Sequence, residues 1–394
     1  MRRILIFLVM VSYCFSCANQ SSKNKKLIPK FRAEHGFYAW KTNWRNPADD
    51  PNFAQFKTNH LYVRMFDVEW SDELDCVVPV SPLNFENTVD DFNGIQNFVP
   101  VIYITNETFK HLSDSAAKQL PQQIYQKLRI LFYQMNDQNQ YEDYVYKEGE
   151  DPYQILYPEL EVKKFKNLDS LVDNYMSCFN EIQFDCDWTP STKEKYFTFL
   201  RSCKKRFNDK TISATIRLYP FKYRKEMGVP PVDKGMLMCY NVGNIQHNDG
   251  INSIFDLKEI QKYLPAKFNY PLPLDYALPI FSWGASYRNG QLNALFDASI
   301  LEDYAFNFEK NKQQDSDESV MKFTVLSNYS FTNLTLKEGD QVRKETVDLK
   351  SVEKLTKILG QKNTNPNPRV ILYQLDHSKI EINAKEIKSI FATF

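Results

Sequence analysis

The chain is 394 residues long, which suits one large domain of barrel size or two domains of ordinary size. Hydrophobic residues make up 43% and charged residues 25% of it, as in an ordinary globular protein. The 49 basic residues balance the 49 acidic ones, and this zero net charge argues against a general nucleic-acid-binding protein, which shows a basic excess.

Residues 1–17 predict a lipoprotein signal peptide. Arg2 and Arg3 supply the positive start, and the apolar run 4–11 that follows is too short to span a bilayer. The small residue Ser16 precedes Cys17, as in the lipobox of bacterial lipoproteins, where the cysteine becomes the lipidated first residue of the mature protein. We therefore expect lipidation at Cys17 and a location in the bacterial cell envelope, anchored to a membrane, the outer membrane. The alternative is an ordinary signal peptide that is cut elsewhere.

The polar stretch after this cysteine predicts a flexible tether over residues 18–34. The cysteines beyond the signal are odd in number and show no C-x-x-C spacing, which argues against a zinc site or a disulfide framework. The 5 histidines are scattered, and the chain has no GxGxxG, P-loop, HExxH or G-x-S-x-G motif. We therefore expect no cofactor.

Short apolar runs alternate with helix-like segments over residues 35–394, and this order predicts a parallel sheet. Eight such units predict a (β/α)8 TIM-like barrel. The predicted strands are 37–40, 61–66, 98–105, 182–187, 212–218, 235–240, 275–281 and 369–375. The predicted helices are 113–136, 168–179, 192–207, 257–263, 349–359 and 384–394.

Two long insertions interrupt this alternation, one after strand three and one after strand seven. The first, residues 137–166, is polar and rich in tyrosine. The second, residues 282–348, contains β-like runs of its own. Because barrel enzymes carry such elaborations on their catalytic face, we interpret the second segment as an insertion there. A separate small β-domain is the alternative.

The most informative stretch is 181–188, with the sequence EIQFDCDW. In a strand, successive side chains alternate between faces, so Gln183, Asp185 and Asp187 are predicted to share one face. Two neighbouring carboxylates disfavour double ionisation, so one of them tends to hold a proton near neutral pH. Glycoside hydrolysis uses a proton donor and a second carboxylate. The alternative is a fixed ion pair of Asp185 with Arg217 inside the barrel.

Reactive residues of a barrel stand at the carboxyl ends of its strands, and most strand ends of this chain carry polar or aromatic groups. We predict four catalytic residues, Asp187, Asp185, Glu69 and Asp67. We predict six substrate-binding residues, Tyr240, Asn241, Arg217, Trp283, Trp40 and Gln183. The alternatives are a solvated Glu69, a Tyr240 that caps the core, and a metal held by the three aspartates through oxygen ligands.

Strands four and six resemble the chitinase-type barrels of glycoside hydrolase family 18. That family has D-x-x-D-x-D-x-E in strand four and M-x-Y-D in strand six, where this chain has DCD at 185–187 and MCYN at 238–241. Ile182 stands at the first aspartate of the motif, Thr189 at the catalytic glutamate and Asn241 at the strand-six aspartate. The overall layout is similar to that of uncharacterised glycosidase-like barrel lipoproteins of Bacteroidota.

Without an acid at Thr189, the substrate-assisted mechanism that the resemblance implies lacks its proton donor. Either another carboxylate, such as Glu69, protonates the leaving group, or the barrel only binds glycan. The first hypothesis is thus a hydrolase of a polysaccharide or a peptidoglycan-derived sugar, with Asp187 and a strand-two carboxylate as acid and base. The second is a non-catalytic glycan-binding or scaffold lipoprotein of the envelope. A purely structural envelope protein is the third.

Overall fold

The structure is a computed structural model that describes residues 33–44, 46–58, 60–85, 95, 97–136, 169–248, 252–311, 318–331 and 334–394. Cys17, most of the predicted tether and the insertion predicted over 137–166 lie outside the described residues. The description below concerns the unit Phe31–Phe394. Within the described ranges, no helix combines the length and apolar character that a membrane span requires.

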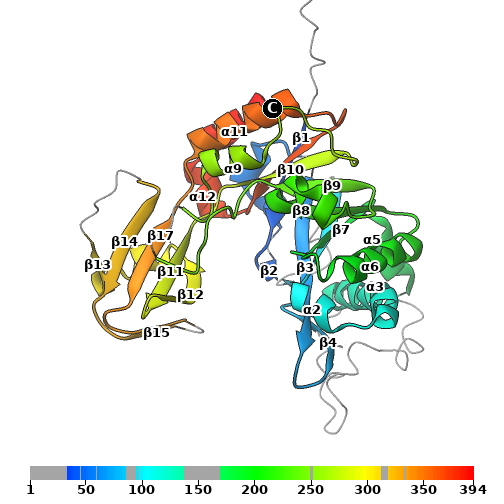
Figure 1. Ribbon diagram of the computed structural model, residues 1–394, viewed down its shortest axis with the longest axis horizontal. Helices are drawn as coiled ribbons and strands as arrows, with labels where there is room; N and C mark the ends of the chain where they lie inside the picture. The colour runs from blue at the N-terminus through cyan, green and yellow to red at the C-terminus, as the bar shows by residue number, and fades with distance from the viewer. Residues whose placement is uncertain are drawn as a thin grey trace, which may run out of the picture. The chain divides into compact units, whose positions relative to one another are not determined.

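Eight parallel strands close into a barrel (Figure 1), which confirms the predicted (β/α)8 TIM-like fold. The strands follow one another around the ring in the order β1-β18-β10-β9-β8-β7-β6-β3, and pairing of β1 with β3 closes it. The barrel strands are β1 (Glu34–Ala39), β3 (His60–Ser71), β6 (Asn97–Ile104), β7 (Glu181–Asp185), β8 (Thr211–Arg217), β9 (Lys234–Met238), β10 (Leu274–Pro279) and β18 (Arg369–Tyr373).

The strands are buried on both faces, as in other parallel barrels. Every residue of β7 and of β10 is buried. On the outer face, Phe184 packs its ring against Phe199, with ring centroids 5.0 Å apart. The residues of β7 that alternate with it, Gln183 and Asp185, make their hydrogen bonds to inner-face residues of neighbouring strands instead. The period-2 pattern therefore places polar groups inside the barrel and apolar groups under the helices.

Helices α3, α5 and α6 lie together beside β6 and β7, and α9 and α11 lie beside β10 (Figure 1). Side-chain caps begin several of them; Asp348, for example, accepts hydrogen bonds from the first backbone N–H groups of α11. The helices around the barrel are α1 (Pro51–Ala54), α2 (Asn106–His111), α3 (Asp114–Asn136), α5 (Asp169–Ser177), α6 (Lys193–Arg206), α7 (Leu218–Lys222), α8 (Arg224–Met227), α9 (Leu257–Tyr263), α11 (Leu349–Lys362), α12 (His377–Ile382) and α13 (Ala384–Thr393), with the 3-10 turn η1 (Pro47–Asp49).

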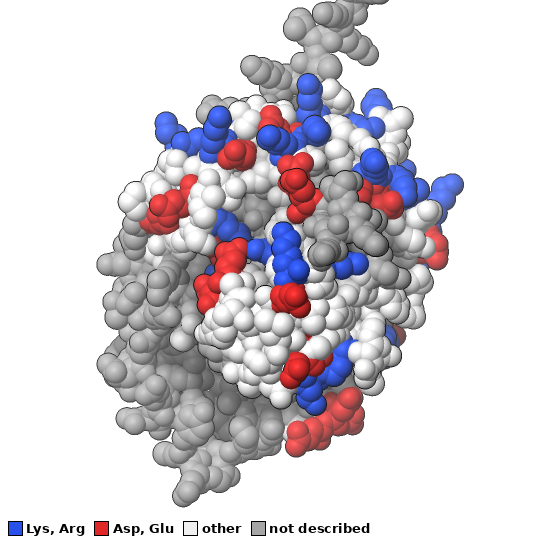
Figure 2. Space-filling model, turned by 90° about the vertical axis from the view of Figure 1, so that its left-hand side faces the viewer, with Lys and Arg blue, Asp and Glu red and all other residues white. Residues whose placement is uncertain are grey.

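A second, antiparallel sheet follows β10 in the chain and has the strand order β12-β11-β17-β14-β13. It has a small apolar core of its own, which includes Phe308, Val325 and Val342. The face shown in Figure 2 mixes charges of both signs, in keeping with the zero net charge of the chain. The segment that forms the second sheet contains β11 (Trp283–Arg288), β12 (Gln291–Asp297), α10 (Ile300–Asp303), η5 (Ala305–Asn307), β13 (Phe308–Lys310), β14 (Val320–Val325), the hairpin β15 (Tyr329–Phe331) and β16 (Leu334–Leu336), and β17 (Gln341–Glu345).

A buried ion pair joins this second sheet to the loop that follows β9. Arg343 and Glu345 are fully buried, with Arg343 Nε 2.9 Å from Glu345 Oε1. The Glu345 carboxylate also accepts hydrogen bonds from the Ser253 backbone N–H at 3.0 Å and from Trp283 Nε1 at 2.7 Å. Arg343 Nη1 donates to the His247 carbonyl at 2.9 Å. The pair thus holds β11 and β17 against the loop at the carboxyl end of β9.

A second buried charge network fills the barrel at the amino ends of its strands. Arg369 Nη1 lies 2.5 Å from Glu181, and Lys234 Nζ lies 2.7 Å from Asp275. Burial alone would raise the pKa of Glu181, but the charges of Lys234 and Arg369 hold it below its ordinary value. Both carboxylates are at most 5% exposed, so each depends on its cation for solvation. This end of the barrel is closed by charge pairing, and the opposite end carries the pocket.

Three short strands complete the described elements. β4 (Cys76–Val80) extends β3 as an antiparallel hairpin, and β2 (Asn43–Trp44) pairs with β5 (Asn84–Phe85).

Candidate functional site

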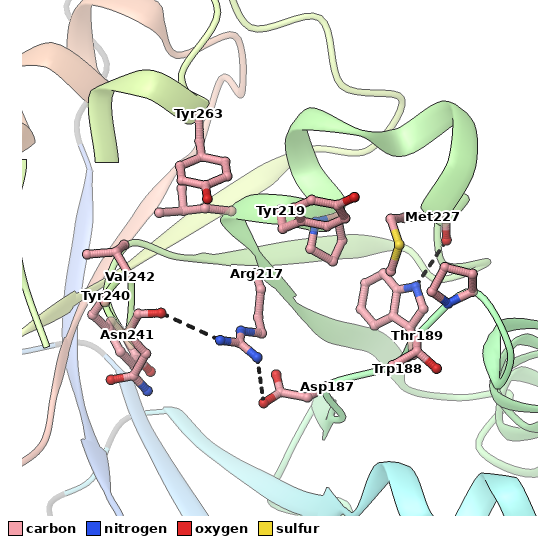
Figure 3. A pocket seen from close by; sticks show the side chains of 14 residues that line it. Asp187, Trp188, Thr189, Arg217, Tyr219, Met227, Tyr240, Asn241, Val242 and Tyr263 are labelled. Carbon is pink, nitrogen blue, oxygen red and sulfur yellow. Dashed lines mark hydrogen bonds and ion pairs between the residues drawn. The ribbon is translucent and has the colours of Figure 1, made fainter. Parts of the chain in front are cut away.

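A pocket of about 340 Å³ opens at the carboxyl ends of β7, β8 and β9 (Figure 3). This volume lies within the range of about 300–1,000 Å³ that is typical of small-molecule sites. The segments directly after the three strands supply most of the wall, and α8 and α9 supply the rest. The lining residues are Asp187, Trp188, Thr189, Pro190, Arg217, Leu218, Tyr219, Pro220, Met227, Tyr240, Asn241, Val242, Gly243 and Tyr263.

An ion pair lies at the centre of the pocket. Arg217 Nη1 is 3.2 Å from Asp187 Oδ2, and Arg217 Nη2 donates to the Asn241 carbonyl at 3.5 Å. The side chains of Arg217 and Asp187 keep 46% and 44% of their surface exposed, so both can reach a ligand. Asn241 has a φ of 56°, in the left-handed region that asparagine tolerates better than most residues. Four of the predicted site residues, Asp187, Arg217, Tyr240 and Asn241, therefore line one pocket.

The two aspartates of strand four occupy different surroundings. β7 ends at Asp185, so Asp187 stands in the loop beyond it and the predicted strand 182–187 is too long. Asp185 is 7% exposed and accepts a hydrogen bond from Thr215 Oγ1 at 2.6 Å. The alternative ion pair of Asp185 with Arg217 does not form, because Arg217 pairs with Asp187. One acid is inside the barrel, and the other is in the pocket wall.

Burial and neighbouring charges shift the pKa values of both acids. Burial, and after it the charge of Asp187, raises the pKa of Asp185 to about 7. Burial also raises the pKa of Asp187, and Arg217 opposes that rise. Burial, followed by the charges of Asp185 and Asp187, raises the pKa of Tyr103 as well, so this tyrosine lies close to both acids and stays protonated. The interior therefore holds a carboxyl that keeps a proton near neutral pH directly beneath one that is paired with a cation.

The strand-two acids lie outside the pocket. β3 runs on to Ser71 rather than ending near residue 66, so Asp67 lies within the strand, opposite Tyr103 of β6. Asp67 is buried, and both of its carboxylate oxygens accept hydrogen bonds from Arg64. Glu69 lies further along, opposite Val78 in the hairpin with β4. The structure thus does not bring Asp67 or Glu69 together with Asp187 in the pocket.

A band of aromatic rings links the remaining candidates. Tyr240 lines the pocket, is buried, and stacks on Tyr373 with ring centroids 5.2 Å apart. Tyr373 also contacts Trp40 at 5.5 Å and Phe281 at 5.2 Å, and Phe281 contacts Trp283 at 5.4 Å. Trp40 and Trp283 are half-buried members of this band and are not among the lining residues. Tyr240 both packs in the core and faces the pocket.

Gln183 lies deeper, inside the barrel. Its side chain is fully buried, accepts a hydrogen bond from Tyr38 and donates to Ser213 Oγ at 3.4 Å. This places it below the pocket, in the layer that β1, β7 and β8 share.

Sequence reasoning left out several residues that shape the site. Thr215 is the hydrogen-bond partner of Asp185. Tyr103 and Tyr373, at the ends of β6 and β18, stand near Asp185. Tyr263 reaches the pocket from the end of α9. The position of Tyr103 and Tyr373 at strand ends was a usable signal, whereas nothing in the sequence pointed to a helix-borne Tyr263.

Ligands for a metal are not gathered at this site. Among the described residues, no group of three or more histidine, cysteine, aspartate or glutamate side chains is placed to hold a metal ion. Asp67 is instead paired with Arg64, and Asp185 with Thr215. The described cysteines, Cys76, Cys178, Cys186, Cys203 and Cys239, are all free.

Several solved structures are similar to this chain over most of its length. A chitinase from Chromobacterium violaceum ATCC 12472 is 10% identical, with 90% of this chain and 99% of that chain covered and a TM-score of 0.44. The spore cortex-lytic enzyme SleL of Bacillus megaterium QM B1551 is 14% identical, with 91% and 75% covered and a TM-score of 0.44. A glycoside hydrolase family 18 N-acetylglucosaminidase from Paenibacillus barengoltzii is 8% identical, with 92% and 100% covered and a TM-score of 0.47.

No family model and no curated protein matches the chain. Likenesses as distant as those above concern the arrangement of the chain and establish no activity or site residue for it. The resemblance to lipoproteins of Bacteroidota stays an expectation from the sequence.

Proposed function

We propose that the protein binds a carbohydrate in the pocket at the carboxyl ends of β7, β8 and β9, as an envelope protein anchored through a lipid on Cys17. The observation that carries the proposal is the composition of the pocket wall. Tyr219 is 47% exposed at the pocket, and Tyr263 lies near it (Figure 3). Aromatic faces pack on the C–H faces of sugar rings, and Asp187 and Arg217 provide an acceptor and donors for hydroxyl groups.

Binding without hydrolysis fits this wall better than turnover does. Hydrolysis of a glycosidic bond needs two carboxyl groups, or an equivalent group, on either side of the scissile bond. Among the lining residues, Asp187 is the single carboxylate, and Thr189 stands where the resemblance would place the catalytic glutamate. Arg217 opposes the rise in the pKa of Asp187 that burial causes, so this cation works against the protonated form that a proton donor needs.

One observation favours hydrolysis as the second candidate. The pKa of Asp185 is about 7, so a protonated carboxyl lies next to Asp187 at neutral pH. In that case the pair would share a proton, and Asp187, which reaches the pocket, would deliver it to the leaving group. Asp185 would then act through Asp187 and would not touch the sugar.

The test uses the full-length protein in detergent, screened on a glycan array and followed by calorimetric titration with each glycan that binds. Tyr219→Ala should weaken binding about three- to tenfold, because it removes an exposed ring from the pocket wall. Phe306→Ala is the matched control, since this ring is 80% exposed, lies in the turn η5 and does not line the pocket. Absence of any glycan ligand, or equal losses in both variants, refutes the proposal.

Turnover is measured on the same glycans as the release of reducing ends. We expect none, and release that disappears in Asp187→Asn would establish the hydrolase instead. The lipid anchor has its own test, because Cys17→Ser should move the protein from the membrane fraction to the soluble fraction of cells. An unchanged membrane fraction would contradict anchoring through Cys17.

A further inference from the structure

The guanidinium of Arg217 has more donors than the protein uses. An arginine carries five N–H donors in a planar fork that matches a carboxylate. Among the described residues, the structure shows two bonds of this group, to Asp187 Oδ2 and to the Asn241 carbonyl. The side chain is 46% exposed, and in Figure 3 the guanidinium lies between Asp187, Tyr219 and Asn241.

Asp187 does not fill this fork. Charge-assisted hydrogen bonds between a guanidinium and a carboxylate measure about 2.7–2.9 Å and are often bidentate. The pair of Arg217 with Asp187 makes one contact, at 3.2 Å. By contrast, Arg64 binds both carboxylate oxygens of Asp67 in the same barrel. Arg217 is thus held in place by a loose partner, and its fork stays accessible from the pocket.

We propose that the pocket selects an acidic sugar, whose carboxylate takes the place of Asp187 on the fork of Arg217. The inference rests on the carbohydrate site proposed above and specifies its ligand class. A neutral sugar would offer only hydroxyl groups to a full positive charge, whereas a carboxylate gives the shorter, bidentate contact.

The charges around the pocket fit an anionic ligand. Arg217 is the single cation and Asp187 the single anion among the lining residues. Two further cations stand near the pocket. Lys222 lies 5.5 Å from the ring of Tyr263, and Lys193 donates to a backbone carbonyl of α8 and pairs with Glu194 at 3.7 Å. Burial raises the pKa of Asp187, so this carboxyl accepts a proton more readily when a second carboxylate approaches. The repulsion that Asp187 would exert on the ligand is thereby reduced.

The test is a calorimetric titration of the full-length protein in detergent with two matched pairs of sugars. One pair is a galacturonate oligomer and its neutral methyl ester, and the other is a disaccharide of N-acetylglucosamine and N-acetylmuramic acid and the disaccharide chitobiose. The first pair differs in whether the carboxylate is free or esterified, and the second differs in the lactyl ether group that carries the carboxylate. In at least one pair the acid should bind about 10- to 100-fold more tightly than its neutral counterpart, as expected for hydrogen bonds to a charged group.

Variants assign this preference to the fork. Arg217→Gln should abolish it, and Arg217→Lys, which keeps the charge without the fork, should retain only part of it. Asp187→Asn should tighten binding of the acid about two- to fivefold, because it removes the competing anion. Lys204→Gln is the matched control, since this lysine pairs with Asp233 and does not line the pocket.

Two outcomes overturn the inference and leave the proposed function standing. One is equal binding of the acid and its neutral counterpart in both pairs, and the other is weaker binding of the acid by Asp187→Asn. If no sugar of either kind binds, the proposed function fails with it. A variant that does not fold is recognised from its melting temperature, and Arg217→Lys then decides in place of Arg217→Gln.

Discussion

The carboxyl of Asp185 makes the stability of the barrel depend on pH. Its pKa is about 7 in the folded protein and near 3.8 in an unfolded chain. Between these two pH values the folded protein holds a proton that the unfolded chain has lost. The free energy of unfolding therefore falls as the pH rises from about 4 to about 7. One pKa unit corresponds to about 1.4 kcal/mol, so a shift of about three units removes about 4 kcal/mol of stability above pH 7.

Replacing Asp185 by asparagine removes this loss. The amide cannot ionise, and its oxygen can still accept the hydrogen bond that Thr215 donates at 2.6 Å. We expect Asp185→Asn to raise the free energy of unfolding by up to about 4 kcal/mol at pH 8 and to leave it nearly unchanged at pH 4. Urea denaturation of both proteins at pH 4, 6 and 8 measures the difference.

Thr215→Val is the companion variant. The hydroxyl of Thr215 lowers the pKa of Asp185, so its removal should move the pH-dependent loss of stability to higher pH. The reasoning is refuted if Asp185→Asn changes the free energy of unfolding by the same amount at pH 4 and at pH 8. That result would mean that Asp185 ionises in the folded protein as readily as in the unfolded chain.

Three further substitutions test the packing around the site. Arg369→Met should cost about 3–5 kcal/mol in urea denaturation, because it leaves Glu181 buried without its nearest cation. Glu345→Gln should speed hydrogen exchange in β11 and β17 more than in the barrel strands, since this buried carboxylate holds Trp283 and pairs with an arginine. Gly36→Ala should cost more than about 3 kcal/mol in thermal unfolding, because a Cβ there would overlap a backbone carbonyl of β3. A free energy of unfolding equal to that of the unmodified protein would contradict the argument for Arg369→Met or Gly36→Ala. Unchanged hydrogen exchange in β11 and β17 would contradict the argument for Glu345→Gln.

The barrel was predictable from the sequence because its strands are buried on both faces. Such strands read as short apolar runs, and the helices between them show a different period, so both the number of units and their order follow. The positions at which the strands end were harder to predict from the sequence. β3 continues past residue 66 to Ser71 because β4 folds back on it, and hydrogen bonds of a hairpin leave no clear signal in the apolar pattern.

The separation of Asp185 from Asp187 shows the same limit at the site. Alternation of faces holds only while a strand is paired with its neighbours. The ladder of β7 with β6 ends at the pair of Tyr103 with Asp185, and its ladder with β8 ends one residue earlier, at Phe184. Two residues at i and i+2 have the same spacing in a strand and in a loop. The spacing therefore does not predict that Asp187 leaves the face that Asp185 occupies.

The choice of partner for Arg217 follows from the same geometry. An ion pair deep in the barrel would require Arg217 to lose its hydration, whereas the pair with Asp187 leaves both groups nearly half exposed. Asp185 is then left without a cation and gains a neutral hydroxyl, so it lowers its cost of burial by keeping a proton. At pH values under about 7, Asp185 is protonated and therefore adds no negative charge to the floor of the pocket. The field that a ligand meets is therefore set by Arg217 and Asp187, and a change of one charge at either residue should alter ligand preference more than a change at Asp185.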